Sequence, residues 1–166
     1  MPLSKNTNFC HKQKSNDIKI RNICMTSISK TADLQSTNST VFIVDDQTTS
    51  RIIMENIAKT IDKDVDVKCF DNAADALSEA KSSMPDLILT DYKMPVIDGV
   101  EFIKRLRNID SCRDIPIVII TALDDKGALY KALEAGATDF LVKPVDPHEC
   151  KVRCRNLLTM QKQRLT

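Results

Sequence analysis

The sequence predicts an α/β protein built on a doubly wound, five-stranded parallel sheet. From residue 40 onward, short apolar runs alternate with segments of helical periodicity, the pattern of repeated strand–helix units. The runs at residues 87–89 and 117–120 are almost continuously apolar, as in strands buried on both faces of a parallel sheet. Charged or hydroxyl residues follow four of the runs, at the edge where doubly wound proteins bind their ligands.

The first half of this region contains three predicted strands and two predicted helices. The strands lie at residues 41–44, 65–70 and 87–90, where apolar and β-branched residues predominate. The intervening helices are predicted at residues 48–60 and 73–83. In the first helix, the residues expected to face the core are Ile52, Ile53, Ile57 and Ala58.

The second half continues the alternation. Strands are predicted at residues 117–120 and 139–142, and helices at 99–108, at 126–135 and from Pro147 toward Arg164. Right-handed crossovers between successive strands then place helices on both faces of the sheet. In the first of these helices, the inward residues are expected to be Val100, Ile103 and Leu106.

Polar and special residues mark the helix ends. The helix at 73–83 is expected to start after a capping residue, either Asp71 or Asn72, and to end before Pro85. Asp98 is placed to cap the next helix. Gly136 suits the C-terminal end of the helix predicted at residues 126–135. Pro147 suits the first turn of the last helix.

Composition divides the chain into three parts. Residues 1–39 hold six Lys and Arg against two Asp and Glu and are rich in Ser, Thr and Asn. We expect them to form a basic, mostly disordered extension, with Met25 as an alternative natural start. Residues 40–160 hold the predicted domain, and residues 161–166 are the end of the last helix or a linker.

Charge and cysteine usage exclude several classes of function. Residues 40–166 carry eighteen Lys and Arg against twenty-one Asp and Glu, which gives no support for direct nucleic-acid binding. No apolar stretch reaches the length of a membrane span. The six cysteines form no C-x-x-C pair and follow no secretory leader, which favours buried thiols over a zinc site. We therefore expect a cytoplasmic protein without direct contact to nucleic acid or membrane.

Reactive side chains follow four of the predicted strands. Asp45 and Asp46 follow the first strand, Asp91 the third, Thr121 the fourth and Lys143 the fifth. Parallel strands would bring these groups to one edge, where three carboxylates repel one another unless a cation is present. Mg²⁺ suits a site with few carboxylates, several waters and a phosphate, and aspartate can form an acyl phosphate. The pattern therefore predicts Mg²⁺-dependent phosphoryl transfer.

These residues belong to a larger pattern that resembles a known family. The segments Val44-Asp45-Asp46, Asp91-Tyr92-Lys93-Met94-Pro95 with Asp98-Gly99, Thr121-Ala122 and Lys143-Pro144 are similar to the receiver domain of two-component response regulators. The resemblance covers residues 41–160. It implies a flavodoxin-like fold with strand order 2-1-3-4-5.

The resemblance also implies a role for each site residue. Asp91 would accept a phosphoryl group from a histidine kinase or a histidine phosphotransfer protein. Asp45, Asp46, Asp91 and the backbone carbonyl of Lys93 would hold Mg²⁺, and Lys143 would neutralise the phosphoryl group. Such a domain catalyses only its own phosphorylation and dephosphorylation and is not otherwise an enzyme.

A switch is implied by the same resemblance. Thr121 would move toward the phosphoryl group, and Phe140, at a position where many members have tyrosine, would fill the vacated space. The face formed by residues 126–160 would then change and bind a downstream effector. A phosphorylation-dependent homodimer is compatible with this scheme. Candidates on or beneath the face are Tyr130, Leu133, Val152 and Cys154.

The last helix bears on the output of the domain. Residues 148–165 resemble receivers joined to HD-GYP cyclic-di-GMP phosphodiesterases, in which the last helix continues into the enzyme. This chain contains no His-Asp catalytic pair and no Gly-Tyr-Pro motif, so we expect no phosphodiesterase activity from it. The basic residues of the helix also suit an ordinary solvated face. The chain either acts through a partner or is the receiver part of a longer protein.

Three other functions share part of this pattern. A phosphatase of the haloacid-dehalogenase type needs Asp-x-Asp after the first strand, where this chain has Asp45-Asp46-Gln47. A flavodoxin-like nucleotide or flavin binder would use residues 47–50 as a phosphate loop, but these residues include no glycine for close backbone approach. A non-phosphorylated adaptor receiver would lack site residues that are all present here.

Overall fold

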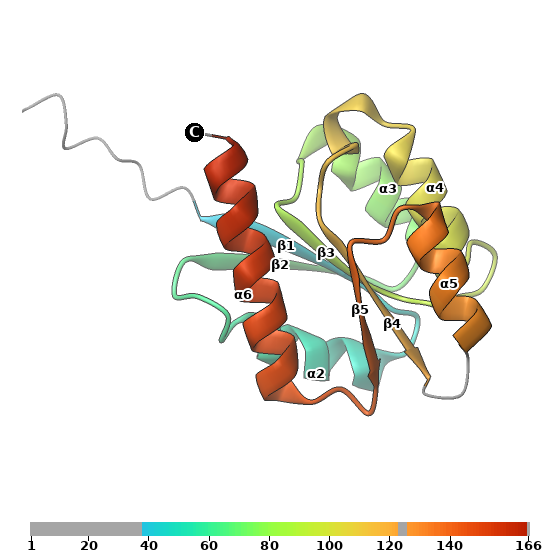
Figure 1. The fold of residues 1–166 in the computed structure, drawn as a ribbon, viewed down its shortest axis with the longest axis horizontal. Coiled ribbons are helices and arrows are strands. Elements are labelled where there is room, and N and C mark those ends of the chain that lie inside the picture. Colours follow the sequence, from blue (N-terminus) through green and yellow to red (C-terminus); the bar gives the residue numbers. More distant parts are fainter. Residues whose placement is uncertain (1–37, 123–125, 166) are drawn as a thin grey trace, which may run out of the picture. The chain divides into compact units, whose positions relative to one another are not determined.

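Five strands and five α-helices alternate along the part of the chain described by the computed structural model, residues 38–122 and 126–165 (Figure 1). Residues 37–166 form one compact unit. The predicted extension over residues 1–39, including the alternative start at Met25, lies almost wholly outside the described residues. No helix of the described residues has both the length and the apolar character needed to cross a membrane.

The five strands form a single parallel sheet, as predicted from the alternation. Its strand order is β2-β1-β3-β4-β5, which confirms the expected fold class and order. Val44 pairs with Thr90, and Asp91 pairs with Ile120, so β1, β3 and β4 end close to one another. The strands are β1 (Ser39–Val44), β2 (Val65–Phe70), β3 (Leu87–Asp91), β4 (Ile117–Ala122) and β5 (Asp139–Lys143).

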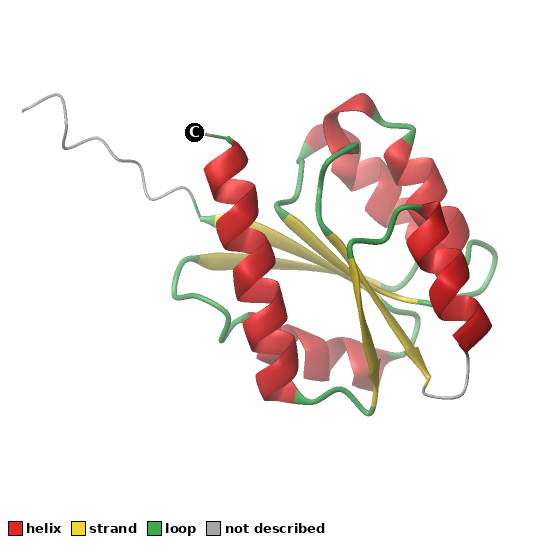
Figure 2. Ribbon diagram, viewed as in Figure 1, coloured by secondary structure: helices red, strands yellow, loops and turns green. Residues whose placement is uncertain are grey.

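The helices cover both faces of the sheet (Figure 2). Two of them, α2 and α6, lie on one face, and the other three lie on the opposite face (Figure 1). A short 3-10 turn, η1 (Asp110–Cys112), leads from α4 toward β4. The helices are α2 (Thr48–Ala58), α3 (Ala73–Ser82), α4 (Gly99–Arg107), α5 (Lys126–Ala135) and α6 (Pro147–Arg164).

Capping side chains fix three of the helix starts. Asn72, Asp98 and Asp146 each accept a hydrogen bond at 2.7–2.8 Å from the N–H three residues further on. Each such cap contributes about 1 kcal/mol. Gly136, directly after α5, has a φ of 108°, a conformation that side chains with a Cβ rarely adopt. Of the two caps considered for α3, the structure uses Asn72.

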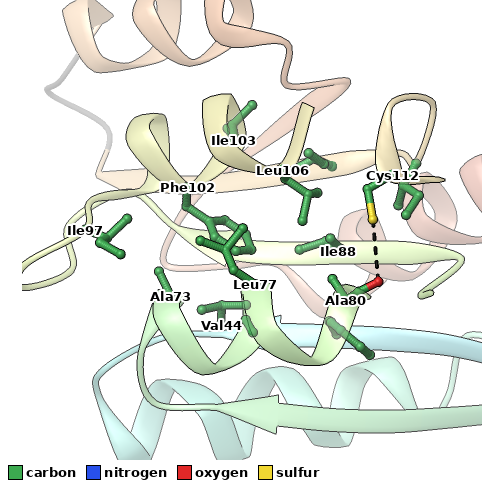
Figure 3. Close-up of a cluster of buried hydrophobic side chains, with 14 of the residues drawn as sticks. Val44, Ala73, Leu77, Ala80, Ile88, Ile97, Phe102, Ile103, Leu106 and Cys112 are labelled. Atoms are coloured by element: carbon green, nitrogen blue, oxygen red, sulfur yellow. Dashed lines mark hydrogen bonds between the residues drawn. The ribbon is translucent and has the colours of Figure 1, made fainter. Parts of the chain in front are cut away.

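A separate hydrophobic core lies on each face of the sheet. Figure 3 shows the core beneath α3 and α4, where Leu77 and Phe102 meet the sheet residue Ile88. In the same core the thiol of Cys112 donates to the carbonyl of Ala80 at 3.7 Å. The other core lies beneath α2 and α6 and contains Met54, Ile57, Leu89, Leu141, Cys150, Cys154 and Leu158.

The inner face predicted for α2 is partly wrong. Ile52 and Ile53 are 52% and 50% exposed, whereas Met54 is buried together with Ile57 and Ala58. The buried stripe runs through residues 54, 57, 58 and 61, at helical spacing. In α4, Ile103 and Leu106 are buried as predicted, Val100 is only partly buried, and Phe102 is fully buried.

Candidate functional site

Three carboxylates gather where β1 and β3 end. One oxygen from each of Asp45, Asp46 and Asp91 lies within 4.8 Å of the other two. Asp45 and Asp91 are buried, whereas Asp46 is exposed. The pairing of β1 with β3 produces this gathering, because both strands run in the same direction and end together. Every donor in the cluster is an oxygen atom, which fits a hard divalent cation such as Mg²⁺.

A single ammonium group completes the cluster from the other side. Nζ of Lys143, at the end of β5, lies 2.6 Å from Oδ1 of Asp91 and 3.5 Å from Oδ2 of Asp45. Burial opposes the charge on Lys143, but the hydrogen bond and charge of Asp91, together with Asp45, raise the pKa of Lys143 above its usual value. The ammonium is therefore held in its charged form next to the two buried carboxylates.

The carboxyl group of Asp91 is in an unfavourable setting for a negative charge. Burial raises its pKa, and the charge of Asp45 adds to this effect. Lys143 and the backbone N–H of Lys93, which donates to Oδ2 of Asp91 at 3.0 Å, oppose the increase without cancelling it. A second cation beside Asp91 would lower the cost of the ionised form.

Asp45 is fixed by the start of α2. Its Oδ1 accepts from the N–H of Gln47 at 2.8 Å, and its Oδ2 accepts from the hydroxyl of Ser50. The guanidinium of Arg51 donates to the Asp45 carbonyl at 2.7 Å. The sequence reasoning missed both Ser50 and Arg51. Their roles could have been inferred from the sequence, because they place a hydroxyl and a guanidinium in the first turn of the helix that directly follows Asp45 and Asp46.

Gly99 fixes the backbone of Asp91 by its lack of a side chain. The N–H of Gly99 donates to the carbonyl of Tyr92 at 2.9 Å. A Cβ added to Gly99 would lie 2.5 Å from the carbonyl oxygen of Asp91, closer than such atoms approach in proteins. The start of α4 can therefore pack against the end of β3 only with glycine at this position.

Thr121 lies one residue beyond the partner of Asp91 on β4. Its side chain is buried, and its hydroxyl has no hydrogen-bond partner among the described residues. Phe140, on the neighbouring strand β5, is partly buried and packs against the core beneath α3 and α4. A buried hydroxyl without a partner is rare, and it leaves Thr121 able to bond an incoming acceptor.

The face formed by α5, β5 and α6 carries several exposed apolar side chains. Tyr130, Leu133 and Val152 are exposed, whereas Cys154 is fully buried beneath this face. Their roles in a switch stay predictions.

Comparison with known proteins agrees with this geometry. The model of the response regulator receiver domain matches residues 41–155. The chain is 44% identical over 137 residues to the cyclic di-GMP phosphodiesterase response regulator RpfG of Xanthomonas campestris. That match covers 82% of this chain but only 35% of RpfG, so the chain spans about a third of the length of this relative.

Solved structures share the fold. A response regulator from Chloroflexus aurantiacus superposes with a TM-score of 0.69 at 32% identity, covering 73% of this chain and 98% of that one. The receiver domain of the sensor histidine kinase PA1611 from Pseudomonas aeruginosa, solved with a magnesium ion in its active-site cleft, has a TM-score of 0.67 at 24% identity. It covers 74% of this chain and 98% of its own, and its likeness concerns the fold. By its family match and its fold, this chain belongs to the response regulator receiver domain family of two-component signalling proteins.

Proposed function

We propose that Asp91 is the phosphoacceptor of this receiver domain and that it is phosphorylated by the phosphohistidine of a histidine kinase or a histidine phosphotransfer protein. The observation that carries the proposal is the contact at 2.6 Å between Asp91 and Lys143, beside the carboxylates of Asp45 and Asp46. This arrangement has both a nucleophilic carboxylate and a fixed positive charge for the transferred group.

Mg²⁺ is the cofactor that we propose for the acidic cluster. The carboxylates of Asp45, Asp46 and Asp91 would hold it, together with the backbone carbonyl of Lys93. When bound, the ion would offset charge on the phosphoryl oxygens. The all-oxygen donor set and the raised pKa of Asp91 both support a bound cation at this place.

The chemical step follows from positions in the cluster. An oxygen of the Asp91 carboxylate attacks phosphorus in line, the phosphorus–nitrogen bond of the phosphohistidine breaks, and its electron pair returns to the imidazole. Lys143 exchanges its ion pair with the Asp91 carboxylate for one with the phosphoryl oxygens. Asp45 stays in place because the first turn of α2 holds it.

Switching is proposed to begin at Thr121. Its hydroxyl has no acceptor among the described residues, and a phosphoryl oxygen on Asp91 would supply one. Leaving such a group unsatisfied costs about 1–3 kcal/mol, so the phosphorylated form would gain a comparable amount when Thr121 moves inward. Phe140 would follow, and the face of α5, β5 and α6 would change toward its effector, or toward a homodimer.

The arrangement of domains and the location are also proposals. Residues 40–160 form the receiver, residues 1–39 an extension, and residues 161–166 the end of α6 or a linker. A cytoplasmic location is supported by the four cysteines of the described residues, which are all free thiols. The comparisons identify a receiver domain in this chain, and we propose that its output acts through an effector or a following domain rather than through its own enzymatic activity.

Phosphorylation of the purified chain tests the assignment of Asp91. With Mg²⁺ and acetyl phosphate, we expect a hydroxylamine-sensitive phosphate on the wild type and none on Asp91→Asn. Asp71→Asn, a change of an exposed aspartate just after β2, is the matched control and should label like the wild type. Equal labelling of Asp91→Asn, or a coloured flavin that co-purifies with the chain, would overturn the proposal.

The metal arm of the test uses calorimetric titration with Mg²⁺. Asp46→Ala should weaken Mg²⁺ binding by about 100-fold or more, because loss of a direct ligand exceeds the 10- to 100-fold typical of outer-shell changes. Asp71→Ala should bind Mg²⁺ like the wild type. Unchanged affinity in Asp46→Ala would reject the metal assignment.

A further inference from the structure

A second site is suggested by a cavity at the edge of the sheet opposite the acidic cluster. The cavity has a volume of about 210 Å³. Pro116 and Thr138, which line it, directly precede β4 and β5, whereas the acidic residues lie at or just beyond the ends of β1 and β3. The end of α4 and the last two turns of α6 form its other walls.

Arg107 brings an uncompensated positive charge to this cavity. It is half-buried, and its guanidinium donates to the carbonyls of Gly136, Cys112 and Ile115 in four hydrogen bonds of 2.7–3.1 Å. No carboxylate of the described residues lies within ion-pair distance of it. Burial lowers the pKa of Arg107, and the more distant charge of Asp114 opposes this only in part.

The hydrogen-bond count leaves one donor of Arg107 available. A guanidinium has five N–H donors, and the four bonds use the one on Nε, both on Nη1 and one on Nη2. The bonded carbonyls are neutral, so they solvate the charge without cancelling it. A half-buried cation with a spare donor is stabilised most by an anion that it can bond directly.

Gln161 is the second, independent observation. The residue is 93% buried in α6 and lines the cavity. Its amide has no hydrogen-bond partner among residues 38–122 and 126–165. The fully buried side-chain polar atoms without a partner in the described residues are the hydroxyls of Ser39 and Thr121, so the Gln161 amide still reaches the open space of the cavity and can bond water or a ligand there.

The rest of the lining selects the charge and size of a ligand. Arg113 and Arg164 add two guanidinium groups, of which that of Arg113 is also paired with Asp110 at 2.8 Å, and Asp114 is the one carboxylate of the lining. The cavity is smaller than the roughly 300–1,000 Å³ of pockets that hold drug-sized ligands. Planar guanidinium groups bind carboxylate and phosphate oxygens in pairs of parallel bonds. These features favour a small oxyanion over a neutral or a cationic ligand.

We propose that this cavity binds a small carboxylate or phosphate anion, through Arg107, Gln161, Arg113 and Arg164. The anion would bond two groups that line the cavity, the spare donor of Arg107 and the accessible amide of Gln161. It would also join the end of α6, which carries Gln161 and Arg164, to α4 and the turn before β4. Occupancy of the site therefore sets how firmly the last two turns of α6 are held, independently of the chemistry at Asp91.

Nuclear magnetic resonance on the full chain tests the site. The side-chain amide of Gln161 and the Nε–H of Arg107 are followed during titration with sodium phosphate and, separately, with sodium citrate. Sodium chloride at matched ionic strength is the third arm, and Mg²⁺ is omitted to keep phosphate away from the acidic cluster. We expect saturable shifts with at least one oxyanion and none with chloride, and the tighter arm identifies the anion class.

Variants distinguish specific binding of an anion in the cavity from nonspecific attraction of anions to basic side chains. Arg113→Ala with Arg164→Ala should weaken binding by about tenfold or more, because two charge-assisted bonds are lost. Gln161→Leu should weaken it about fivefold, the value for one neutral hydrogen bond. Arg105→Ala, an exposed arginine of α4 outside the cavity, should bind like the wild type.

Three results would overturn the proposal. These are no saturable shift with either oxyanion, equal shifts with chloride, and unchanged affinity in the double arginine variant. Arg113 and Arg164 are exposed, so their replacement leaves the fold intact and the test holds even if Gln161→Leu fails to fold.

Discussion

The ammonium nitrogen of Lys143 lies 2.6 Å from Oδ1 of Asp91, so the cation proposed to neutralise the phosphoryl group is already paired with the proposed nucleophile. The two residues end different strands, β5 and β3, which are separated in the sheet by β4. The resting ion pair therefore spans the strand that carries Thr121. A change in the charge of Asp91 therefore affects both strands that neighbour β4, namely β3, which carries Asp91, and β5, which carries Lys143.

Replacing Lys143 by alanine tests this pairing. Lys143→Ala should lower the free energy of unfolding by about 1–3 kcal/mol, between the values for exposed and buried pairs, because two buried carboxylates lose their cation. Mg²⁺ binding should persist, since the carboxylates remain. Urea unfolding and calorimetric titration measure the two effects. Lys104→Ala, at an exposed position of α4, is the control, and a loss of Mg²⁺ binding as complete as in Asp46→Ala would contradict the expectation.

Thr121→Val should stabilise the unphosphorylated protein. Valine has the same shape and removes a buried hydroxyl without a partner, so unfolding should cost about 1 kcal/mol more. The hydroxyl of Thr90 is also buried but donates to the carbonyl of Asp91 at 3.2 Å, so Thr90→Val should instead destabilise by about 1 kcal/mol. Urea unfolding compares both variants, and a loss of stability in Thr121→Val like that expected for Thr90→Val would show that the Thr121 hydroxyl is satisfied in solution.

Gly99→Ala should destabilise the fold. The added methyl group meets the Asp91 carbonyl at 2.5 Å, and relief requires a backbone shift of α4 or β3, at about 1–3 kcal/mol. Phosphate incorporation should fall in the same variant, because the shift moves Asp91. Glu101→Ala, a partly exposed residue in the first turn of the same helix, should stay within about 0.5 kcal/mol of the wild type. If Gly99→Ala has the stability of the wild type, the start of α4 lies further from the end of β3 than the structure places it.

Val96→Asn should stabilise the chain. Val96 has a φ of 68° and a fully exposed side chain, so its strain is not offset by packing. The left-handed conformation costs a β-branched residue about 1–2 kcal/mol, and asparagine tolerates it better. We expect a gain of about 0.5–1 kcal/mol in thermal or urea unfolding, the scale of backbone-compatible replacements. Val152→Asn, at an exposed helical position, is the control and should show no gain.

The alternation of strand and helix patterns was sufficient to predict a parallel sheet covered on both faces, because each element is marked by the periodicity of its own residues. The strand order came from the resemblance to receiver domains and is confirmed by the pairing of the strands. The inner face of α2 was predicted less well. Ile52, Ile53, Met54 and Ile57 offer two overlapping helical stripes, and burial of Ile61 beyond the helix end decides between them. That choice depends on how α2 lies on the sheet, which is a tertiary property.

Contacts between distant segments were also beyond sequence reasoning. Arg107 bonds the carbonyl of Gly136, 29 residues away, and no local pattern marks an arginine for such a role. The steric need for glycine at residue 99 likewise appears only when α4 meets the end of β3. The gathering of the three carboxylates was easier to predict. Parallel strands end at the same edge of the sheet, so the residues that follow them meet there.

The complete burial of β3 has a mechanical consequence. All five of its residues are inaccessible, and it is hydrogen-bonded to β1 on one side and β4 on the other. Amide protons of such a strand exchange with solvent only when the whole domain opens. Asp91 thus lies on a strand that is buried along its whole length, whereas both edge strands are less protected: four of the five residues of β5 are only partly buried, and no residue of β2 is buried. A displacement that starts at Asp91, in the middle of the sheet, would therefore appear as movement of the edge strands.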